Sequence, residues 1–86
     1  MLYMVIEVFK PGMKEAVYDR YAERGRMLPE GLEYLSSWVE ENGSRCFQLM
    51  QCERQDLLQH WVKEWADLVE FEIVPVMGSP TIQDQA

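Results

Sequence analysis

The sequence holds few of the residues from which catalytic and cofactor sites are usually built. Its 86 residues include one histidine, His60, and two cysteines, Cys46 and Cys52. The five glycines stand singly, so the chain has neither a phosphate-binding loop nor a dinucleotide-binding fingerprint. The G-x-S-x-G motif of serine hydrolases is also missing. We therefore predict no metal site within one chain and no cofactor.

Positive charge is scarce as well. Eight lysines and arginines stand against 15 aspartates and glutamates, which gives a formal net charge of −7. Such a charge repels phosphate backbones, so nucleic-acid binding is not expected. Arg20, Arg24 and Arg26 lie close together in the sequence, but Asp19 and Glu23 are interleaved with them. This pattern favours a solvated face over a basic patch.

Long apolar runs are missing too. No run approaches the roughly 20 residues that span a bilayer. The N-terminal MLYMVIEVFK lacks the basic start of a signal peptide, and Pro11 and Gly12 follow it, which is typical of a strand ended by a turn. We expect a cytoplasmic protein without membrane association, whose two thiols stay reduced.

The hydrophobic pattern changes period several times along the chain. Short β-branched and aromatic runs predict strands, and apolar residues at helical spacing predict helices. The predicted strands are residues 2–9, 32–41, 44–52 and 68–76, and the predicted helices are residues 13–26 and 53–67. This β-α-β-β-α-β order predicts an α+β, ferredoxin-like fold, a four-stranded antiparallel sheet with both helices on one face. We expect one domain over residues 1–76 and a flexible tail over residues 77–86.

The dipeptide Asn42-Gly43 predicts a two-residue type I′ turn between the second and third strands. Such a turn fixes which residues of the two strands face one another. The predicted pairs are Glu40/Arg45, Val39/Cys46, Trp38/Phe47, Ser37/Gln48, Leu35/Met50 and Glu33/Cys52. The first of these pairs is expected to be an ion pair beside the turn.

Both faces of the predicted sheet are largely apolar. Along the first strand, Leu2, Met4, Ile6 and Val8 alternate with Tyr3, Val5, Glu7 and Phe9. An antiparallel sheet with one wet face should instead alternate between apolar and polar residues. A second copy of the same sheet would cover the face without helices. We therefore predict a homodimer that pairs through this face, most simply as a dimeric α/β barrel.

The two cysteines lie six residues apart on one predicted strand. At about 3.4 Å per residue, their Cα atoms are roughly 20 Å apart. A disulfide needs a separation below about 7 Å, so a bond between them is excluded if the strand forms. No C-x-x-C motif is present and no histidine lies near either thiol in the sequence. The favoured interpretation is a pair of inert buried thiols.

Glu7 and His60 are the candidate catalytic residues. The helices could cover the side of the last strand that carries Val69, Phe71 and Ile73. Glu7, Glu70 and Glu72 would then point together to the other side of the sheet. Clustered carboxylates raise one another's pKa and can hold a proton or a cation. The alternative is a solvated edge strand protected from aggregation by its charge. His60 is either a general base or an ordinary surface histidine.

A candidate ligand site follows from the polar residues that interrupt apolar faces. The pair Ser37 and Gln48 lies among apolar neighbours, where the two side chains either satisfy each other or orient a ligand. The candidate ligand-binding residues are Arg24, Arg26, Ser37, Trp38, Gln48 and Trp61. Three functions remain open. They are a small-molecule-binding protein, a cofactor-independent monooxygenase or isomerase with Glu7 or His60 as base near Trp38 or Trp61, and a structural module without a ligand.

Three blocks taken together, ERGRMLPEGLEYLSSWVE, RCFQLMQCE and DLVEFEIVPV, carry a family resemblance. The chain resembles, from Met1 to about Val76, a family of small bacterial proteins known only as a domain of unknown function (DUF3303). The resemblance implies a ferredoxin-like, dimeric α/β-barrel fold and carries over no catalytic residues. Dimeric barrels in general include antibiotic-biosynthesis monooxygenases and haem-degrading enzymes, but that likeness is at the level of fold alone.

Overall fold

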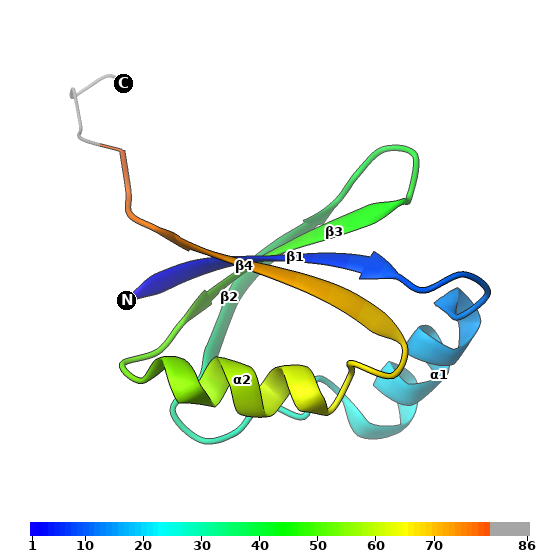
Figure 1. Ribbon diagram of the computed structural model, residues 1–86, viewed down its shortest axis with the longest axis horizontal. Coiled ribbons are helices and arrows are strands. Elements are labelled where there is room, and N and C mark those ends of the chain that lie inside the picture. Colours follow the sequence, from blue (N-terminus) through cyan, green and yellow to red (C-terminus); the bar gives the residue numbers. More distant parts are fainter. Residues whose placement is uncertain (80–86) are drawn as a thin grey trace.

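The computed structural model describes residues 1–79. They form six elements in the order β-α-β-β-α-β, as predicted (Figure 1). The elements are β1 (Leu2–Phe9), α1 (Lys14–Arg24), β2 (Glu33–Val39), β3 (Arg45–Gln51), α2 (Gln55–Lys63) and β4 (Val69–Val76). The tail predicted for residues 77–86 lies mostly outside the described residues.

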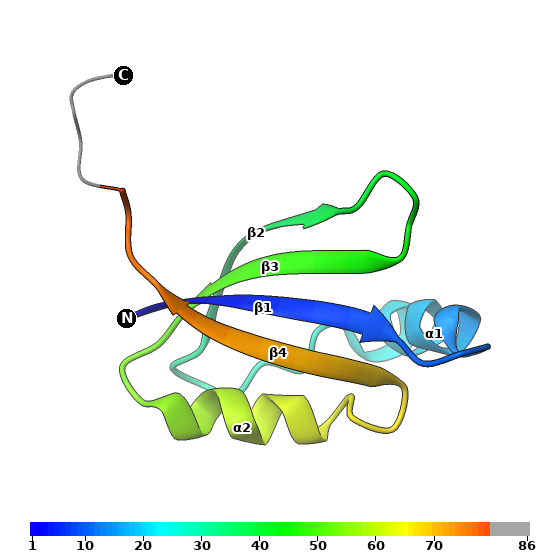
Figure 2. The ribbon, with the colours of Figure 1, turned by 45° about the horizontal axis from the view of Figure 1, so that its top comes forward.

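The four strands form one antiparallel sheet in the order β2-β3-β1-β4 (Figure 2). Both helices lie on the same side of this sheet, and its other side is free (Figure 1). The predicted ferredoxin-like α+β fold is therefore confirmed. We call the side that carries the helices the covered face and the other side the open face. β1 and β3 are the two central strands, so residues on them have neighbours on both sides.

Both helices are shorter than the sequence pattern predicted. α1 ends at Arg24 because Gly25 takes a positive φ of 68°, and its N–H donates to the carbonyl of Tyr21. α2 ends at Lys63, and residues 64–67 continue as turns that lead into β4. These early ends leave the connection from α1 to β2, residues 25–32, free to fold against the covered face.

The hydrophobic core lies between the covered face and α2. Side chains from the sheet and from α2 are nearly or completely buried there. They include Tyr3 and Val5 of β1, Met50 of β3, and Leu58 and Trp61 of α2. Trp65, Leu68 and Val69 extend this core toward the start of β4. The strand alternation predicted for β1 is confirmed, since its buried residues are Tyr3, Val5 and Glu7.

The predicted hairpin register is confirmed near the turn and wrong farther from it. The pairs Val39/Cys46, Trp38/Phe47 and Ser37/Gln48 form as expected. The expected pairs Leu35/Met50 and Glu33/Cys52 do not form. Instead, Tyr34 faces Met50 and Glu33 faces Gln51. A β-bulge between Tyr34 and Ser36 inserts one extra residue into β2 and shifts all pairs beyond it.

The bulge exchanges two side chains between the faces of the sheet. The register prediction put Leu35 beside Ser37 and put Tyr34 on the opposite face. In the structure, Leu35 is the extra residue and is exposed, whereas Tyr34 lies on the covered face with Ser37. The hydroxyl groups of Tyr34 and Ser37 hydrogen-bond to each other at 2.7 Å. An aromatic ring is thereby added to the covered face.

The three carboxylates of β1 and β4 do not cluster. Glu7 pairs in register with Phe71, so both lie on the covered face, and Glu7 is buried. Glu70 and Glu72 pair with Val8 and Ile6 and are exposed on the open face. The predicted arrangement in which all three carboxylates share one side is therefore wrong. Adjacent residues of a strand point to opposite faces, and the β1–β4 register separates Glu7 from the other two.

Candidate functional site

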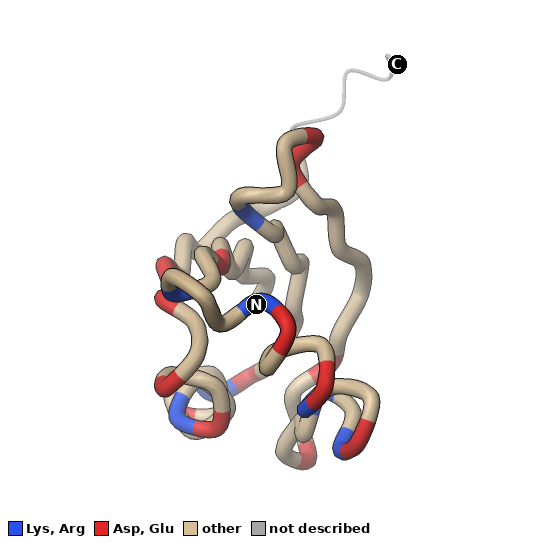
Figure 3. Tube along the Cα trace, turned by 90° about the vertical axis from the view of Figure 1, so that its right-hand side faces the viewer, with Lys and Arg blue, Asp and Glu red and all other residues tan. Residues whose placement is uncertain are grey.

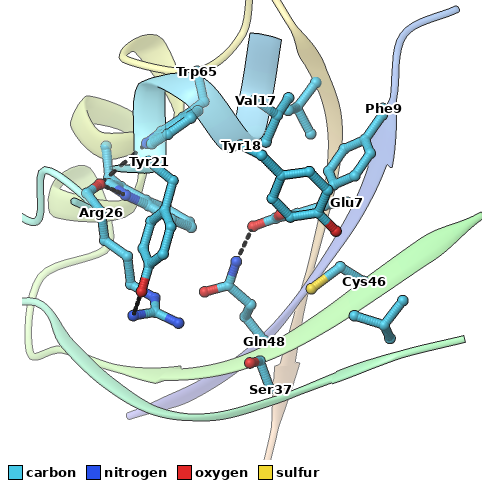
Figure 4. A pocket seen from close by; sticks show the side chains of 13 residues that line it. Glu7, Phe9, Val17, Tyr18, Tyr21, Arg26, Ser37, Cys46, Gln48 and Trp65 are labelled. Atoms are coloured by element: carbon cyan, nitrogen blue, oxygen red, sulfur yellow. Dashed lines mark hydrogen bonds between the residues drawn. The ribbon is translucent and has the colours of Figure 1, made fainter. Parts of the chain in front are cut away.

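A cavity of about 200 Å³ lies between the covered face and the helices (Figure 4). Its walls are mainly aromatic and apolar. They include Phe9, Val17, Tyr18, Tyr21, Trp61, Trp65 and Val69. Five other residues bring polar or sulfur atoms to the lining: Glu7, Arg26, Ser37, Cys46 and Gln48. This composition, an apolar enclosure with a few polar groups, is that of a small-molecule site.

Glu7 is the charged group on the floor of this cavity. It lies on a central strand with only 7% of its surface exposed, between Cys46 on β3 and Phe71 on β4. Burial raises the pKa of the Glu7 carboxyl to about 7, although the charge of Arg26 and a hydrogen bond from Gln48 both lower it. Near neutral pH this carboxyl therefore holds its proton far more readily than an ordinary glutamate does.

Gln48 holds Glu7 in place. Its side-chain Nε2 donates a hydrogen bond to Oε2 of Glu7, within the buried floor of the cavity (Figure 4). The other end of the amide, Oε1, is buried and finds no hydrogen-bond partner within residues 1–79. Of the two alternatives for Ser37 and Gln48, the one in which they satisfy each other does not occur, because Ser37 bonds to Tyr34 instead. Gln48 thus presents an unused acceptor at the cavity.

Arg26 supplies the positive charge of the site. Its guanidinium lies over the Tyr34 ring, 3.6 Å from the ring centre, and its Nη1 donates to the Tyr21 hydroxyl at 3.3 Å. The buried Nε of Arg26 has no hydrogen-bond partner in the part of the chain that the structure describes. The indole N–H groups of Trp61 and Trp65 both donate to the backbone carbonyl of Arg26, at 2.8 and 3.1 Å. Arg26 is therefore fixed at both its backbone and its side chain.

Cys46 lines the cavity but is a poor nucleophile. Burial and the nearby Glu7 raise the pKa of its thiol to about 11, against a smaller lowering by Arg26. The thiol is therefore protonated at neutral pH. Cys52 is buried in the core, and burial likewise raises its pKa. Both cysteines are free thiols.

The residues singled out from the sequence divide into two groups. Glu7, Arg26, Ser37, Gln48 and Trp61 come together around the cavity. Three others lie away from it. Arg24 is exposed and pairs with Glu23 at 3.8 Å, Trp38 is exposed on the open face, and His60 is exposed on α2.

Sequence reasoning missed several residues of this site. Tyr34 was placed on the wrong face because the bulge could not be read from the alternation. Tyr21 and Tyr18 are half-exposed residues of α1 that line the opening of the cavity. Trp65 lies four residues after Trp61, one helical turn apart. That spacing could have indicated that the two indoles act on the same neighbour.

The arginines of the surface are distributed among separate ion pairs and do not form a basic patch. Acidic and basic segments alternate along the chain trace (Figure 3). Arg20 binds Asp67 through both of its terminal nitrogens, at 2.9 and 2.7 Å. The predicted Glu40–Arg45 ion pair is confirmed at 2.9 Å. The three arginines of residues 20–26 thus have three different surroundings, and only Arg26 reaches the cavity.

Residues 1–79 contain neither a membrane-spanning helix nor a cluster of metal ligands. No helix there is long and apolar enough to cross a membrane. The same part of the chain contains no group of three or more histidine, cysteine, aspartate or glutamate side chains arranged to hold a metal ion.

Comparison with known proteins gives a family but no activity. No curated protein and no solved structure matches the chain. One family model matches residues 1–84, and its description is "Domain of unknown function (DUF3303)". The match covers nearly the whole sequence and agrees with the resemblance seen in its three blocks. The chain therefore belongs to the DUF3303 family.

Proposed function

We propose that this protein binds a small, mainly apolar molecule in the cavity between its sheet and helices. One observation carries the proposal: an aromatic cavity contains both a buried acceptor, Gln48 Oε1, and a buried donor, Arg26 Nε, that have no partner. Buried polar atoms are almost always hydrogen-bonded in native proteins. A ligand with one acceptor and one donor would satisfy both atoms.

The volume of the cavity limits the size of this ligand. A cavity of about 150 Å³ can hold benzene, and pockets for drug-sized molecules begin near 300 Å³. The observed volume of about 200 Å³ lies between these values. The ligand is therefore of single-ring size, with one or two polar substituents.

The proposal includes a homodimer that pairs through the open face. Neither of the helices described within residues 1–79 covers this face (Figure 1). One row across it consists of Trp38, Phe47, Ile6 and Glu72 on four adjacent strands. Trp38 is 54% exposed, which is unusual for a large aromatic residue. Two such faces packed together would remove these side chains from water.

We place the protein in the cytoplasm, where its two thiols would stay reduced.

Binding is tested with single-ring probes. Ligand-observed NMR with toluene and phenol should show saturation transfer from the wild-type protein. The variant Cys46→Phe fills part of the cavity and should abolish the transfer, whereas Trp38→Phe on the open face should retain it. Thermal melting checks that both variants fold. Equal binding by Cys46→Phe would place the site elsewhere, and no binding of either probe to the wild type would contradict the proposal. Native mass spectrometry of protein from its own host would then show the mass of a retained ligand.

The dimer is tested separately by sedimentation equilibrium at micromolar concentration. We expect a dimer for the wild type and a monomer for Phe47→Glu, because a charge placed in the middle of the open face cannot be buried without a partner. The exposed helix variant Arg24→Met serves as the control and should remain dimeric. A wild-type protein that is monomeric at this concentration would refute this part of the proposal.

A further inference from the structure

Glu7 and Arg26 are opposite charges at one cavity that do not pair with each other. Within residues 1–79, neither side chain takes part in an ion pair. Glu7 is held by Gln48 on the floor, and Arg26 is held by Tyr34 and Tyr21 on the wall. A buried acid and a fixed cation that remain separate leave room for a ligand between them.

The free atoms of the two groups are suited to different tasks. Gln48 donates to Oε2 of Glu7, so Oε1 of the carboxyl keeps its lone pairs for another partner. One face of the Arg26 guanidinium is covered by Tyr34, but its edge nitrogens remain donors, and the buried Nε is unused. Figure 4 shows Oε1 of Gln48 on the side of the amide that faces Arg26. A base, a cation and an acceptor thus surround one space.

We propose that the site transfers a proton on a single-ring carbonyl compound, with Glu7 as the base and Arg26 as the stabiliser of the resulting enolate. This inference rests on the proposed function, because it requires a ligand in the cavity. The carboxylate of Glu7 removes a proton from the carbon next to the carbonyl. The electron pair of the broken C–H bond forms a C=C bond, and the carbonyl π pair moves to the oxygen beside Arg26. Glu7 then returns the proton to the oxygen or to a second carbon, which completes a tautomerisation or an isomerisation.

The surroundings of Glu7 suit a base that works near neutral pH. A general base is most effective when its pKa lies close to the working pH, and that of Glu7 is raised to about 7 by burial. The titratable groups that line the cavity around it are Arg26, the Cys46 thiol, and Tyr18 and Tyr21 from α1. The aromatic walls would exclude water and strengthen the attraction between Arg26 and an enolate oxygen. The step needs no oxidant, since proton loss and gain balance.

The first test measures turnover of a β,γ-unsaturated cyclohexenone in heavy water by NMR. Isomerisation to the conjugated ketone and deuterium uptake both report formation of an enolate. We expect the wild type to accelerate both over buffer, with a rate that rises with pH through an apparent pKa near 7. Glu7→Gln should lose at least a hundred-fold and should lose this pH dependence. Arg26→Met should lose at least ten-fold, whereas the exposed variants His60→Gln and Arg24→Met should keep the wild-type rate.

The second test uses para-nitrophenol, a ring with an ionisable oxygen whose colour differs between phenol and phenolate. The bound dye should be more ionised than the free dye at the same pH. Arg26→Met should lower the ionisation constant of the bound dye at least ten-fold. The dye also separates the two proposals. If the dye binds as the neutral phenol, the proton-transfer inference is overturned and ligand binding stands. The same holds if the protein binds toluene but converts the cyclohexenone no faster than buffer does. Failure to bind toluene and phenol would remove both proposals.

Discussion

Both faces of this sheet carry apolar side chains, but their carboxylates lie in different surroundings. On the covered face, Glu7 and Gln48 sit on the two central strands and are buried. On the open face, the carboxylates Glu70 and Glu72 sit on the edge strand β4 and are exposed. Polar groups at an edge keep their contact with water, whereas those on central strands must find partners inside the protein. The comparison shows that the face and the strand together decide whether a carboxylate of this sheet is buried, as Glu7 is, or keeps its contact with water, as Glu70 and Glu72 do.

The largest effect should come from removing one buried side chain behind the covered face. Met50 is fully buried, and its neighbour Leu49 points to the open face and is half-buried. Met50→Ala should lower the free energy of unfolding by about 2–5 kcal/mol. In a monomer, Leu49→Ala should lower the free energy of unfolding by about 1 kcal/mol. If the open face is buried in a dimer, this loss should grow as the protein concentration rises. Urea unfolding at two protein concentrations measures both values. A concentration-independent cost for Leu49→Ala would argue against the dimer.

Glu7→Gln should stabilise the protein at high pH and not at low pH. The pKa of Glu7 is raised in the folded state from 4.5 to about 7, so the folded protein holds this proton more tightly than the unfolded chain does. Stability therefore falls as the pH rises from about 4.5 to 7, by roughly 3 kcal/mol from this group alone. The variant cannot ionise and avoids that loss. Unfolding free energies at pH 4 and pH 8 test this, with Glu70→Gln on the open face as the matched control. An equal effect of Glu7→Gln at both pH values would contradict the burial of the carboxylate.

Cys46 should react slowly despite being only half-buried. Its thiol pKa is raised from 9.0 to about 11, so the reactive thiolate is rare near pH 8. We expect alkylation of Cys46 by iodoacetamide to be at least ten-fold slower than that of free cysteine at the same pH. Glu7→Gln removes a negative neighbour and should make this reaction faster. Mass spectrometry of the alkylated protein over time gives the rates, and a rate equal to that of free cysteine would show that the covered face is open to solvent.

A smaller effect than that of Met50→Ala should come from replacing either of the two tryptophans that share the Arg26 carbonyl. Trp61→Phe or Trp65→Phe alone should cost about 1–2 kcal/mol, because the remaining indole still satisfies the carbonyl. The double variant leaves that carbonyl without either donor. Its loss in the free energy of unfolding should exceed the sum of the two single losses by about 1 kcal/mol. Urea unfolding of the three variants provides the cycle. Strict additivity would mean that the two hydrogen bonds act independently.

The fold could be predicted because the chain marks its elements locally. The change of hydrophobic period, the Asn42-Gly43 turn and the chain order were sufficient for the sheet, the helices and the register near the turn. The bulge in β2 could not be predicted, since Tyr34 and Leu35 fit either face by polarity. Its position decides which ring supports Arg26. The face of Glu7 followed from the alternation of β1, but its separation from Glu70 and Glu72 depended on pairing between strands distant in the sequence.

Half of the site was visible in the sequence as isolated polar residues. Glu7 and Gln48 stood out because each interrupts an apolar strand. What joins them to Arg26 is the connection from α1 to β2, whose path depends on Trp61 and Trp65 binding one carbonyl. Such a contact between a loop and a distant helix leaves no periodic trace in the sequence. Arg24 and Arg26 were therefore equivalent candidates, although only Arg26 enters the cavity.

The shared carbonyl of Arg26 also determines how a molecule could reach the cavity. Trp61 of α2 and Trp65 of the turn after it both donate to this carbonyl, so α2 and the loop that follows α1 cannot separate without breaking two hydrogen bonds. The opening of the cavity must then lie on the opposite side. There Tyr18, Tyr21 and Val39 each line the cavity and are about half exposed to solvent. A ligand would enter between α1 and the β2–β3 hairpin. It would pass the two tyrosine rings before it reached Glu7 or Arg26.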